Sequence, residues 1–313
     1  MKTENLKNKF RQIKLIHVVM LCAVVFVIFS ILGTTLLAAG GSWNNNFNMI
    51  DGLFAVAQGR HVVVQDNPII VDDQVEHELA GLTGIRIVTV LDDVILAHGG
   101  DKIRVHVKGK CRGLVEPVRL ESVFQESMLI VAVKHTKNSR SDGGGYSCSS
   151  SLTVTLPNDY QGDLALAAAS GELRARNLPL VLNKVKLETL SGDVDFNIAG
   201  YRELSAKTVS GDLALWNVAA PTDVNTVSGE VDIHFEKAAK THIKTVSGDV
   251  DISVPAGESF AVKFQSTSGE FKSSFPGLLT KNVRRNFQGS FGSGGEMMEI
   301  NTTSGDCELK ATR

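Results

Sequence analysis

The chain contains only four cysteines in 313 residues, which excludes a small scaffold held together by disulfides. Cys22 lies in a long apolar run, and the pattern around Cys307 predicts a small buried side chain there. Cys111 and Cys148 can form a bond if their part of the chain is exported and their geometry allows it. The sequence leaves that question open.

The sequence also lacks an excess of positive charge beyond its first residues. Residues 1–14 hold five of the 32 basic and one of the 34 acidic residues. The rest therefore carries 27 basic and 33 acidic side chains, a net charge of about −6. A nucleic-acid-binding protein normally presents a basic footprint. We therefore expect no nucleic-acid partner.

Common catalytic motifs are absent. The eight histidines are scattered, and His77-Glu78 lacks the second histidine of the zinc-protease motif. The sequence contains no nucleophile elbow, no phosphate-binding P-loop and no Cys-x-x-Cys pair. We therefore predict no catalytic residue, no cofactor and no enzyme activity.

Charge is absent from residues 15–39, a mostly apolar run that follows the basic residues 1–14. As a helix it spans a bilayer core of about 30 Å, and the basic flank belongs on the cytoplasmic side. We expect residues 1–14 to be a cytoplasmic tail and residues 15–39 a transmembrane signal anchor. The chain would then be a single-pass protein of the cell membrane with an extracytoplasmic C-terminal domain. A cleaved signal peptide is the competing interpretation, although the apolar run is long and Leu37-Ala38-Ala39 is a poor cleavage site.

A serine-glycine-acid triplet recurs along the C-terminal half. Successive serines are 21, 19, 18, 19, 21 and 36 residues apart. A nearly constant period with a constant turn indicates a solenoid. Glycine suits such a corner because it adopts positive φ without a Cβ clash. The triplets begin at Ser170, Ser191, Ser210, Ser228, Ser247, Ser268 and Ser304.

Residues beside each triplet alternate between apolar and polar. After Ser247, for example, Val250, Ile252 and Val254 alternate with Asp251 and Ser253, as in a strand with one buried face. One repeat cannot bury its apolar side alone, whereas stacking at about 4.8 Å per tier closes a core. We therefore predict an all-β fold with a parallel β-solenoid over residues 161–313. An antiparallel sandwich is the alternative.

The flanking regions fit this organisation less regularly. Residues 80–160 alternate as strands and are interpreted as an N-terminal β region that leads into the solenoid. Residues 40–79 are interpreted as a linker and an ambiguous segment. The 36-residue gap before Ser304 corresponds to two repeats, one of which has lost its triplet and gained the glycine-rich stretch 288–295. Atypical terminal repeats are expected because an end tier needs a cap.

Stacked repeats would align their acidic residues in a column. Carboxylates about 5 Å apart repel by about 1 kcal/mol in water, so something must offset the repulsion. Either each carboxylate accepts backbone N–H bonds at its corner, or the column binds a cation, with Ca²⁺ favoured by oxygen ligands. The candidate cation column is Glu172, Asp193, Asp212, Glu230, Asp249 and Glu270.

Trp216 occupies an outward position where other repeats place polar residues such as Asn197 and Ser253. An exposed tryptophan can stack on a sugar or anchor a protein partner. Trp216 is therefore a candidate partner contact. The alternative is that a neighbouring loop covers it.

The set of motifs resembles the bacterial "putative adhesin" domain-of-unknown-function family, as in LiaG-like membrane-anchored envelope proteins. The resemblance covers roughly residues 85–313. Its segments are residues 151–157, Gly162-Asp163-Leu164, the Thr-Val-Ser-Gly-Asp-Val-Asp-Ile repeats, Val254-Pro255-Ala256, Gly294-Gly295 and Thr303-Ser304-Gly305-Asp306. It implies an all-β, repeat-built exported domain in the cell envelope, with no catalytic residues to carry over.

We therefore expect a non-enzymatic, membrane-anchored surface protein whose solenoid presents an interaction face, in adhesion or envelope-stress sensing. Cell-wall or surface polysaccharide, or an envelope protein, is the expected partner. One alternative is a structural scaffold that assembles end to end, against which the divergent last repeats argue. Another is a polysaccharide-processing β-helix enzyme, which would need a basic residue within the acid column.

Overall fold

The computed structural model describes residues 68–112, 118–134, 147–275 and 280–312. All of them belong to the second of the chain's two compact units, Gly59–Arg313. The predicted tail (1–14) and transmembrane anchor (15–39) lie outside the described residues, as does most of the segment 40–79. Within the described ranges no helix is long and apolar enough to cross a membrane.

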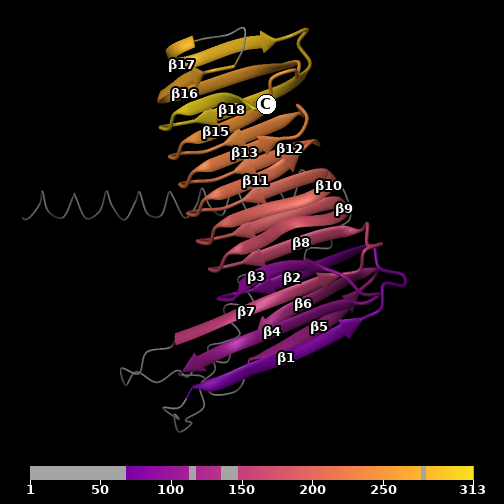
Figure 1. The fold of residues 1–313 in the computed structure, drawn as a ribbon. Helices are drawn as coiled ribbons and strands as arrows, with labels where there is room; N and C mark the ends of the chain where they lie inside the picture. Colours follow the sequence, from indigo (N-terminus) through magenta and orange to yellow (C-terminus); the bar gives the residue numbers. More distant parts are fainter. Residues whose placement is uncertain (1–67, 113–117, 135–146, 276–279, 313) are drawn as a thin grey trace, which may run out of the picture. The chain divides into compact units, whose positions relative to one another are not determined.

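Every regular element in these ranges is a β-strand (Figure 1). The strands are β1 (Ile69–His77), β2 (Gly84–Thr89), β3 (Asp93–His98), β4 (Ile103–Arg112), β5 (Arg119–Gln125), β6 (Met128–Lys134), β7 (Ser147–Leu156), β8 (Asp163–Ala168), β9 (Leu173–Thr189), β10 (Val194–Lys207), β11 (Leu213–Val218), β12 (Thr222–Asn225), β13 (Val231–Phe235), β14 (Thr241–Lys244), β15 (Val250–Pro255), β16 (Phe260–Ser273), β17 (Thr280–Phe291), β18 (Glu296–Thr302) and β19 (Cys307–Thr312).

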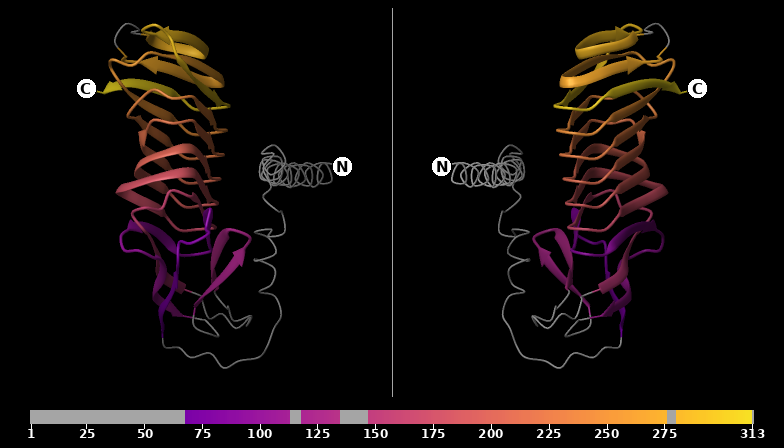
Figure 2. Two further views of the ribbon diagram at one scale, coloured as in Figure 1. Left: turned by 90° about the vertical axis from the view of Figure 1, so that its right-hand side faces the viewer. Right: turned by 90° about the vertical axis from the view of Figure 1, so that its left-hand side faces the viewer.

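The repeats stack in parallel, tier upon tier (Figure 2). The first residue after each triplet pairs with its equivalent in the next tier, so Val194 lies beside Leu213, Leu213 beside Val231, and Val231 beside Val250. Strands that precede the triplets form a second set, in which β10 pairs with β12 and β12 with β14. The expected all-β, solenoid-like stacking is confirmed, and the antiparallel sandwich is excluded for these repeats.

The two sets of strands enclose a narrow apolar core. Val231, Ile233, Val250 and Ile252 are buried, whereas the alternating residues on the same strands point outward, as Asp232 does. The inward positions repeat in every tier, so the core is continuous from the base to the end of the stack.

Parallel stacking reaches back into residues 80–160. β2 pairs with β6 and β8, and β3 pairs with β7 and β9, all in parallel. The base is antiparallel: β4 pairs with β7 and β1, and β5 with β6. β1 falls in the segment that the sequence left ambiguous, and it pairs with β4 over its whole length.

The last tiers do not follow chain order. β18 lies between β14 and β16, and β19 lies between β15 and the end of β16. The C-terminal repeat is therefore inserted into the stack, below strands that precede it in the chain (Figure 2). The antiparallel pair β16–β17 forms the end tier. Stacked and edge-to-face phenylalanines close the core there: Phe260, Phe271, Phe275, Phe287 and Phe291.

Candidate functional site

The acidic residues of the triplets align as predicted, but the column is longer than the sequence indicated. Asp93 extends it below Glu172, because Val94 pairs with Leu173. Asp306 enters it between Asp249 and Glu270, because the C-terminal repeat is inserted there. The column is Asp93, Glu172, Asp193, Asp212, Glu230, Asp249, Asp306 and Glu270.

Aspartates in this column bond to the tier beside them. Asp193 Oδ1 accepts the backbone N–H of Asp212 at 2.9 Å, and Asp212 Oδ1 accepts that of Glu230 at 2.8 Å. The same bond joins Asp249 to the N–H of Asp306 at 2.8 Å. It recurs near both ends of the column. One oxygen of each of these carboxylates therefore satisfies a backbone donor, which offsets repulsion between tiers.

Glutamates in the column behave differently. Glu172 pairs with Arg174, and Glu270 pairs with Arg284 at 3.1 Å. Glu230, in the middle, has no basic side chain within ion-pair distance among the described residues. Desolvation, followed by the negative charges of nearby aspartates, raises the pKa of Glu230 above its usual value. Those aspartates are Asp251, Asp212, Asp232 and Asp249.

Serine and glycine of the triplet also join neighbouring tiers. Ser228 Oγ donates to the carbonyl of Val209 at 3.4 Å, and other triplet serines donate in the same way. A Cβ on Gly211 would lie 2.3 Å from the carbonyl oxygen of Gly192. Positive φ is needed at only some triplet glycines, among them Gly229 at 128°. The common requirement at this position is close backbone packing between tiers.

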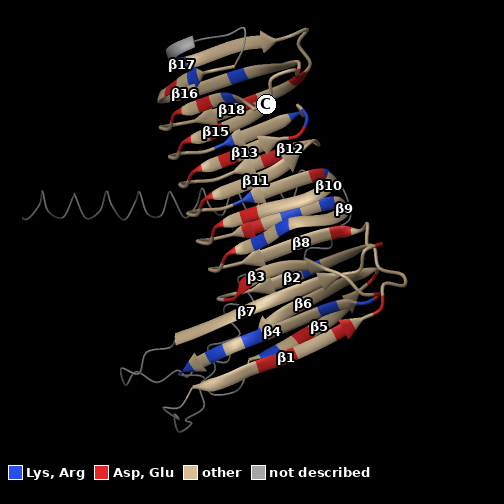
Figure 3. Cartoon of the chain, viewed as in Figure 1, with Lys and Arg blue, Asp and Glu red and all other residues tan. Residues whose placement is uncertain are grey.

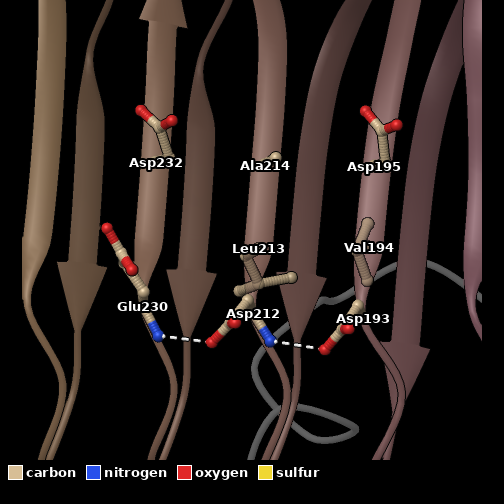
Figure 4. A pocket seen from close by; sticks show the side chains of 8 residues that line it. All are labelled: Asp193, Val194, Asp195, Asp212, Leu213, Ala214, Glu230 and Asp232. Carbon is tan, nitrogen blue, oxygen red and sulfur yellow. Dashed lines mark hydrogen bonds between the residues drawn. The ribbon is translucent and has the colours of Figure 1, made fainter.

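A shallow hollow lies on the outward face beside the middle of the column (Figure 4). Ala214 forms part of its floor, because this small residue stands between Asp195 and Asp232 in the paired strands. The lining is Asp193, Val194, Asp195, Asp212, Leu213, Ala214, Glu230 and Asp232.

Some of these acids are compensated and others are not. Asp195 pairs with Arg176 at 2.9 Å, and Asp232 Oδ2 lies 3.0 Å from His234 Nε2. In the described part of the chain, four successive column acids have no basic side chain within ion-pair distance. We call Asp193, Asp212, Glu230 and Asp249 the acidic strip.

Trp216 borders this region and is half-buried. Its ring stacks on that of His234 in the next tier, with centroids 3.8 Å apart and planes 2° from parallel. Its Nε1 donates to Asp195 Oδ1 at 3.1 Å. The group that covers Trp216 is thus an adjacent side chain rather than the loop that the sequence suggested. One face of the indole is already occupied.

An asparagine ladder on the same side of the stack was not predicted. Asn197 Nδ2 donates to Asn177 Oδ1 at 2.8 Å, and Asn217 Nδ2 donates to Asn197 Oδ1 at 2.7 Å. Asn177 and Asn217 have φ of 49° and 56°, a conformation that asparagine tolerates better than most residues. Recurrence of asparagine near one repeat position was the available signal.

The structure also places the cysteines that the sequence analysis discussed, apart from Cys22, which lies outside the described residues. Cys111 and Cys148 face each other across β4 and β7 and form a disulfide. Cys307 is buried in the core, and burial raises the pKa of its thiol. Over the described residues, no three or more His, Cys, Asp or Glu side chains form a group that could hold a metal ion.

Comparison with solved structures finds distant likenesses. A "putative adhesin" from Bacteroides fragilis shares 10% identity, with a TM-score of 0.42, over 80% of this chain and 100% of that one. A "putative cell adhesion protein" from Clostridium sporogenes shares 10% identity, with a TM-score of 0.37, over 78% of this chain and 100% of that one. A "Putative lipid binding protein" from Parabacteroides distasonis shares 10% identity, with a TM-score of 0.37, over 78% of this chain and 97% of that one.

No curated protein matches this sequence significantly. The family model described as "Toastrack DUF4097" matches twice, over residues 85–222 and 210–310, and so covers most of the chain. These matches contain the triplet repeats and most of the strands that stack with them. The resemblance inferred from the sequence motifs is confirmed, and the chain belongs to the Toastrack DUF4097 family.

Proposed function

We propose that this chain is a non-enzymatic, membrane-anchored protein of the cell envelope, and that its β-solenoid binds a positively charged partner through the acidic strip. The observation that carries the proposal is the strip itself. Its three aspartate carboxylates are held at fixed spacing by backbone bonds between tiers, and no cation of the described chain forms an ion pair with any of its four acids. A partner that supplies positive charge would relieve their mutual repulsion.

The partner expected from this chemistry is a cell-wall or surface polysaccharide that carries amino groups, or a basic segment of an envelope protein. On either side of the strip, Glu172 pairs with Arg174 and Glu270 pairs with Arg284. Binding would therefore centre on the tiers of β10, β11, β13 and β15. Adhesion and envelope-stress sensing are the two roles that such an interaction face would serve.

Export of the solenoid is supported by two observations. The disulfide between Cys111 and Cys148 is of a kind that persists mainly in oxidising compartments. The basic residues 1–14 flank only one end of the apolar run 15–39, which favours a cytoplasmic N-terminus. Protease added to intact cells or spheroplasts should therefore digest residues 60–313. Protection of these residues, with digestion of the tail, would overturn the orientation.

The binding proposal is tested by capture on the detergent-solubilised full chain. Cell-wall, polysaccharide and envelope-protein preparations are offered to the wild type and to the strip variant D212N/E230Q/D249N. The matched control D159N/E236Q/E296Q removes the same charge at exposed positions outside the strip. We expect capture to fall at least about tenfold in the strip variant only, and to weaken with salt. Equal capture by both variants would refute the strip as the binding surface.

A further inference from the structure

Basic residues recur along β4, at the base of the stack (Figure 3). Inward residues of this strand, such as Val105 and Val107, are buried in the core. The outward residues between and beyond them are Arg104, His106, Lys108, Lys110 and Arg112. Alternation along one strand therefore places five basic residues on one surface.

Only the first part of this row is neutralised. Glu76 pairs with Arg104 at 2.7 Å, and Asp72 Oδ1 lies 2.6 Å from His106 Nε2. The other three, Lys108, Lys110 and Arg112, are exposed and have no carboxylate within ion-pair distance among the described residues. Asp72 also stands opposite Lys108 in the strand register, so compensation weakens steadily toward Arg112.

Hydroxyl groups lie beside these three cations. In the antiparallel register of β4 and β7, Ser151 is opposite Lys108, Ser149 opposite Lys110, and Ser147 opposite Arg112. The strands approach closely between the two lysines, where a Cβ on Gly109 would lie 2.3 Å from the carbonyl oxygen of Ser149. Ammonium, guanidinium and hydroxyl donors on one surface suit the oxygens of phosphate groups.

One acid and one apolar side chain border this surface. Asp93 stands opposite Ser151 on β3, and its Oδ1 already accepts the backbone N–H of Glu172 at 3.0 Å. Ile70, on β1 opposite Lys110, is 72% exposed. An exposed aliphatic residue beside cations is the combination found where proteins lie on anionic bilayers.

This surface lies at the point where the chain enters the solenoid. β1 begins at Ile69, directly after the residues that connect it to the apolar run 15–39. The start of β1, the end of β4 and the start of β7 meet at one corner of the base (Figure 1). The chain therefore enters the solenoid at the corner that carries the uncompensated cations.

We propose that this corner, the basal patch of Ile70, Lys108, Lys110, Arg112, Ser147 and Ser149, docks on the anionic phospholipid head groups of the membrane that holds the anchor. The inference rests on the anchoring proposed above. Attraction between the patch and lipid phosphates would hold the base of the solenoid at the membrane surface.

Amine footprinting on the full chain tests the docking. The protein is reconstituted into vesicles of neutral phospholipid, with or without anionic phospholipid, and lysines are acylated briefly and quantified by mass spectrometry. Both leaflets have the same composition, so either orientation meets the same lipid. We expect Lys108 and Lys110 to react at least about fivefold more slowly on anionic vesicles, and the difference to disappear in high salt. Lys237, Lys240 and Lys244, which are exposed on other tiers, should react equally on both.

A variant that keeps both reporter lysines sharpens the test. Ile70→Ser with Arg112→Glu removes the aliphatic contact and reverses one charge, so the protection should fall below about twofold. The matched control is Val181→Ser with Arg202→Glu, which changes an exposed apolar residue and an exposed cation elsewhere. Equal lysine reactivity on the two lipids, or equal loss of protection in both variants, would overturn the docking. Release of the wild type by alkaline carbonate would instead show that the anchoring proposal is wrong.

Discussion

At the scale of single residues, the triplet is explained by contacts between tiers. The serine hydroxyl donates to a carbonyl of the adjacent tier, the glycine lets the backbones approach, and the aspartate accepts an N–H. These contacts recur along the stack, so the effect of a substitution can be predicted from the contact that it removes.

Neighbouring residues of β15 should differ sharply in their effect on stability. Ile252 is 1% exposed in the core, and its replacement by alanine should cost about 2–5 kcal/mol through lost burial and a residual cavity. Asp251 points outward and pairs with Lys310 at 2.8 Å, so Asp251→Ala should cost at most about 1 kcal/mol. Urea unfolding of both variants checks the prediction. Similar costs would contradict the assigned strand register.

Glu230 should make stability depend on pH. Its pKa is raised in the folded protein, chiefly by desolvation and then by nearby aspartates. The folded state therefore binds this proton more tightly than the unfolded chain, and stability falls as pH rises above about 4.3, the ordinary value for glutamate.

Glu230→Gln should consequently stabilise the protein at pH 7, by no more than about 0.5 kcal/mol because the site is exposed and screened. The gain should vanish below about pH 4, where both states are protonated. Urea unfolding at the two pH values measures it, with Glu236→Gln as the control outside the strip. A stability gain that increased as the pH was lowered would contradict a raised pKa of Glu230.

Calcium should leave the melting temperature almost unchanged. Asp193, Asp212 and Asp249 each use one oxygen on a backbone N–H, so their carboxylates are not free to converge on an ion. If Ca²⁺ did bind, a concentration a hundredfold above its Kd would raise the free energy of unfolding by about 2.7 kcal/mol. Thermal melts at millimolar Ca²⁺ distinguish the two cases. A rise of several degrees that is absent from D212N/E230Q/D249N would establish a cation site.

At the scale of elements, the backbones of adjacent tiers approach closely at the corner between strands. Gly211→Ala should cost about 1–3 kcal/mol or more, because its Cβ would lie 2.3 Å from the carbonyl oxygen of Gly192. Gly257→Ala is the matched control, since nothing lies within 4 Å of its Cβ position and its φ is not in the left-handed region. Thermal unfolding should separate the two variants. Equal tolerance would mean that the tiers are further apart than described.

We expect the end strand to oppose assembly into filaments. Among the strands that the structure describes, β17 pairs only with β16, which leaves its other edge without a described partner strand. It carries the exposed residues Arg284 and Arg285, and Arg285 has a φ of 70° that interrupts regular extension. Charge and irregularity at an edge strand oppose pairing with another copy.

At the scale of the whole solenoid, inserting the C-terminal repeat makes the end tier depend on it. Deleting residues 296–313 removes β18 and β19, which separate β16 from the tiers below. Because tiers contact mainly their neighbours, β16 and β17 should unfold locally while β9 to β13 persist. Hydrogen exchange by fragment measures this. Slow exchange in residues 260–291 of the truncated chain would contradict the tier order.

Much of the candidate site was predictable because its residues recur with the repeat. Six acids of the column follow from the triplet spacing alone. Asp93 was missed because its corner reads Leu91-Asp92-Asp93 rather than serine-glycine-acid, and the inserted tier of Asp306 depends on pairing between distant strands. The stacking of Trp216 on His234 also required the register of adjacent tiers.

The sequence by itself determined the all-β class, the repeat period, the inward faces of the strands and the family, because these are local patterns that the chain repeats. Tertiary structure decided the order of the last tiers, since β18 can pair with any strand that offers a free edge. It also decided which charges remain uncompensated. Lys108, Lys110 and Arg112 remain uncompensated because β1 supplies carboxylates to one end of β4 and not to the other.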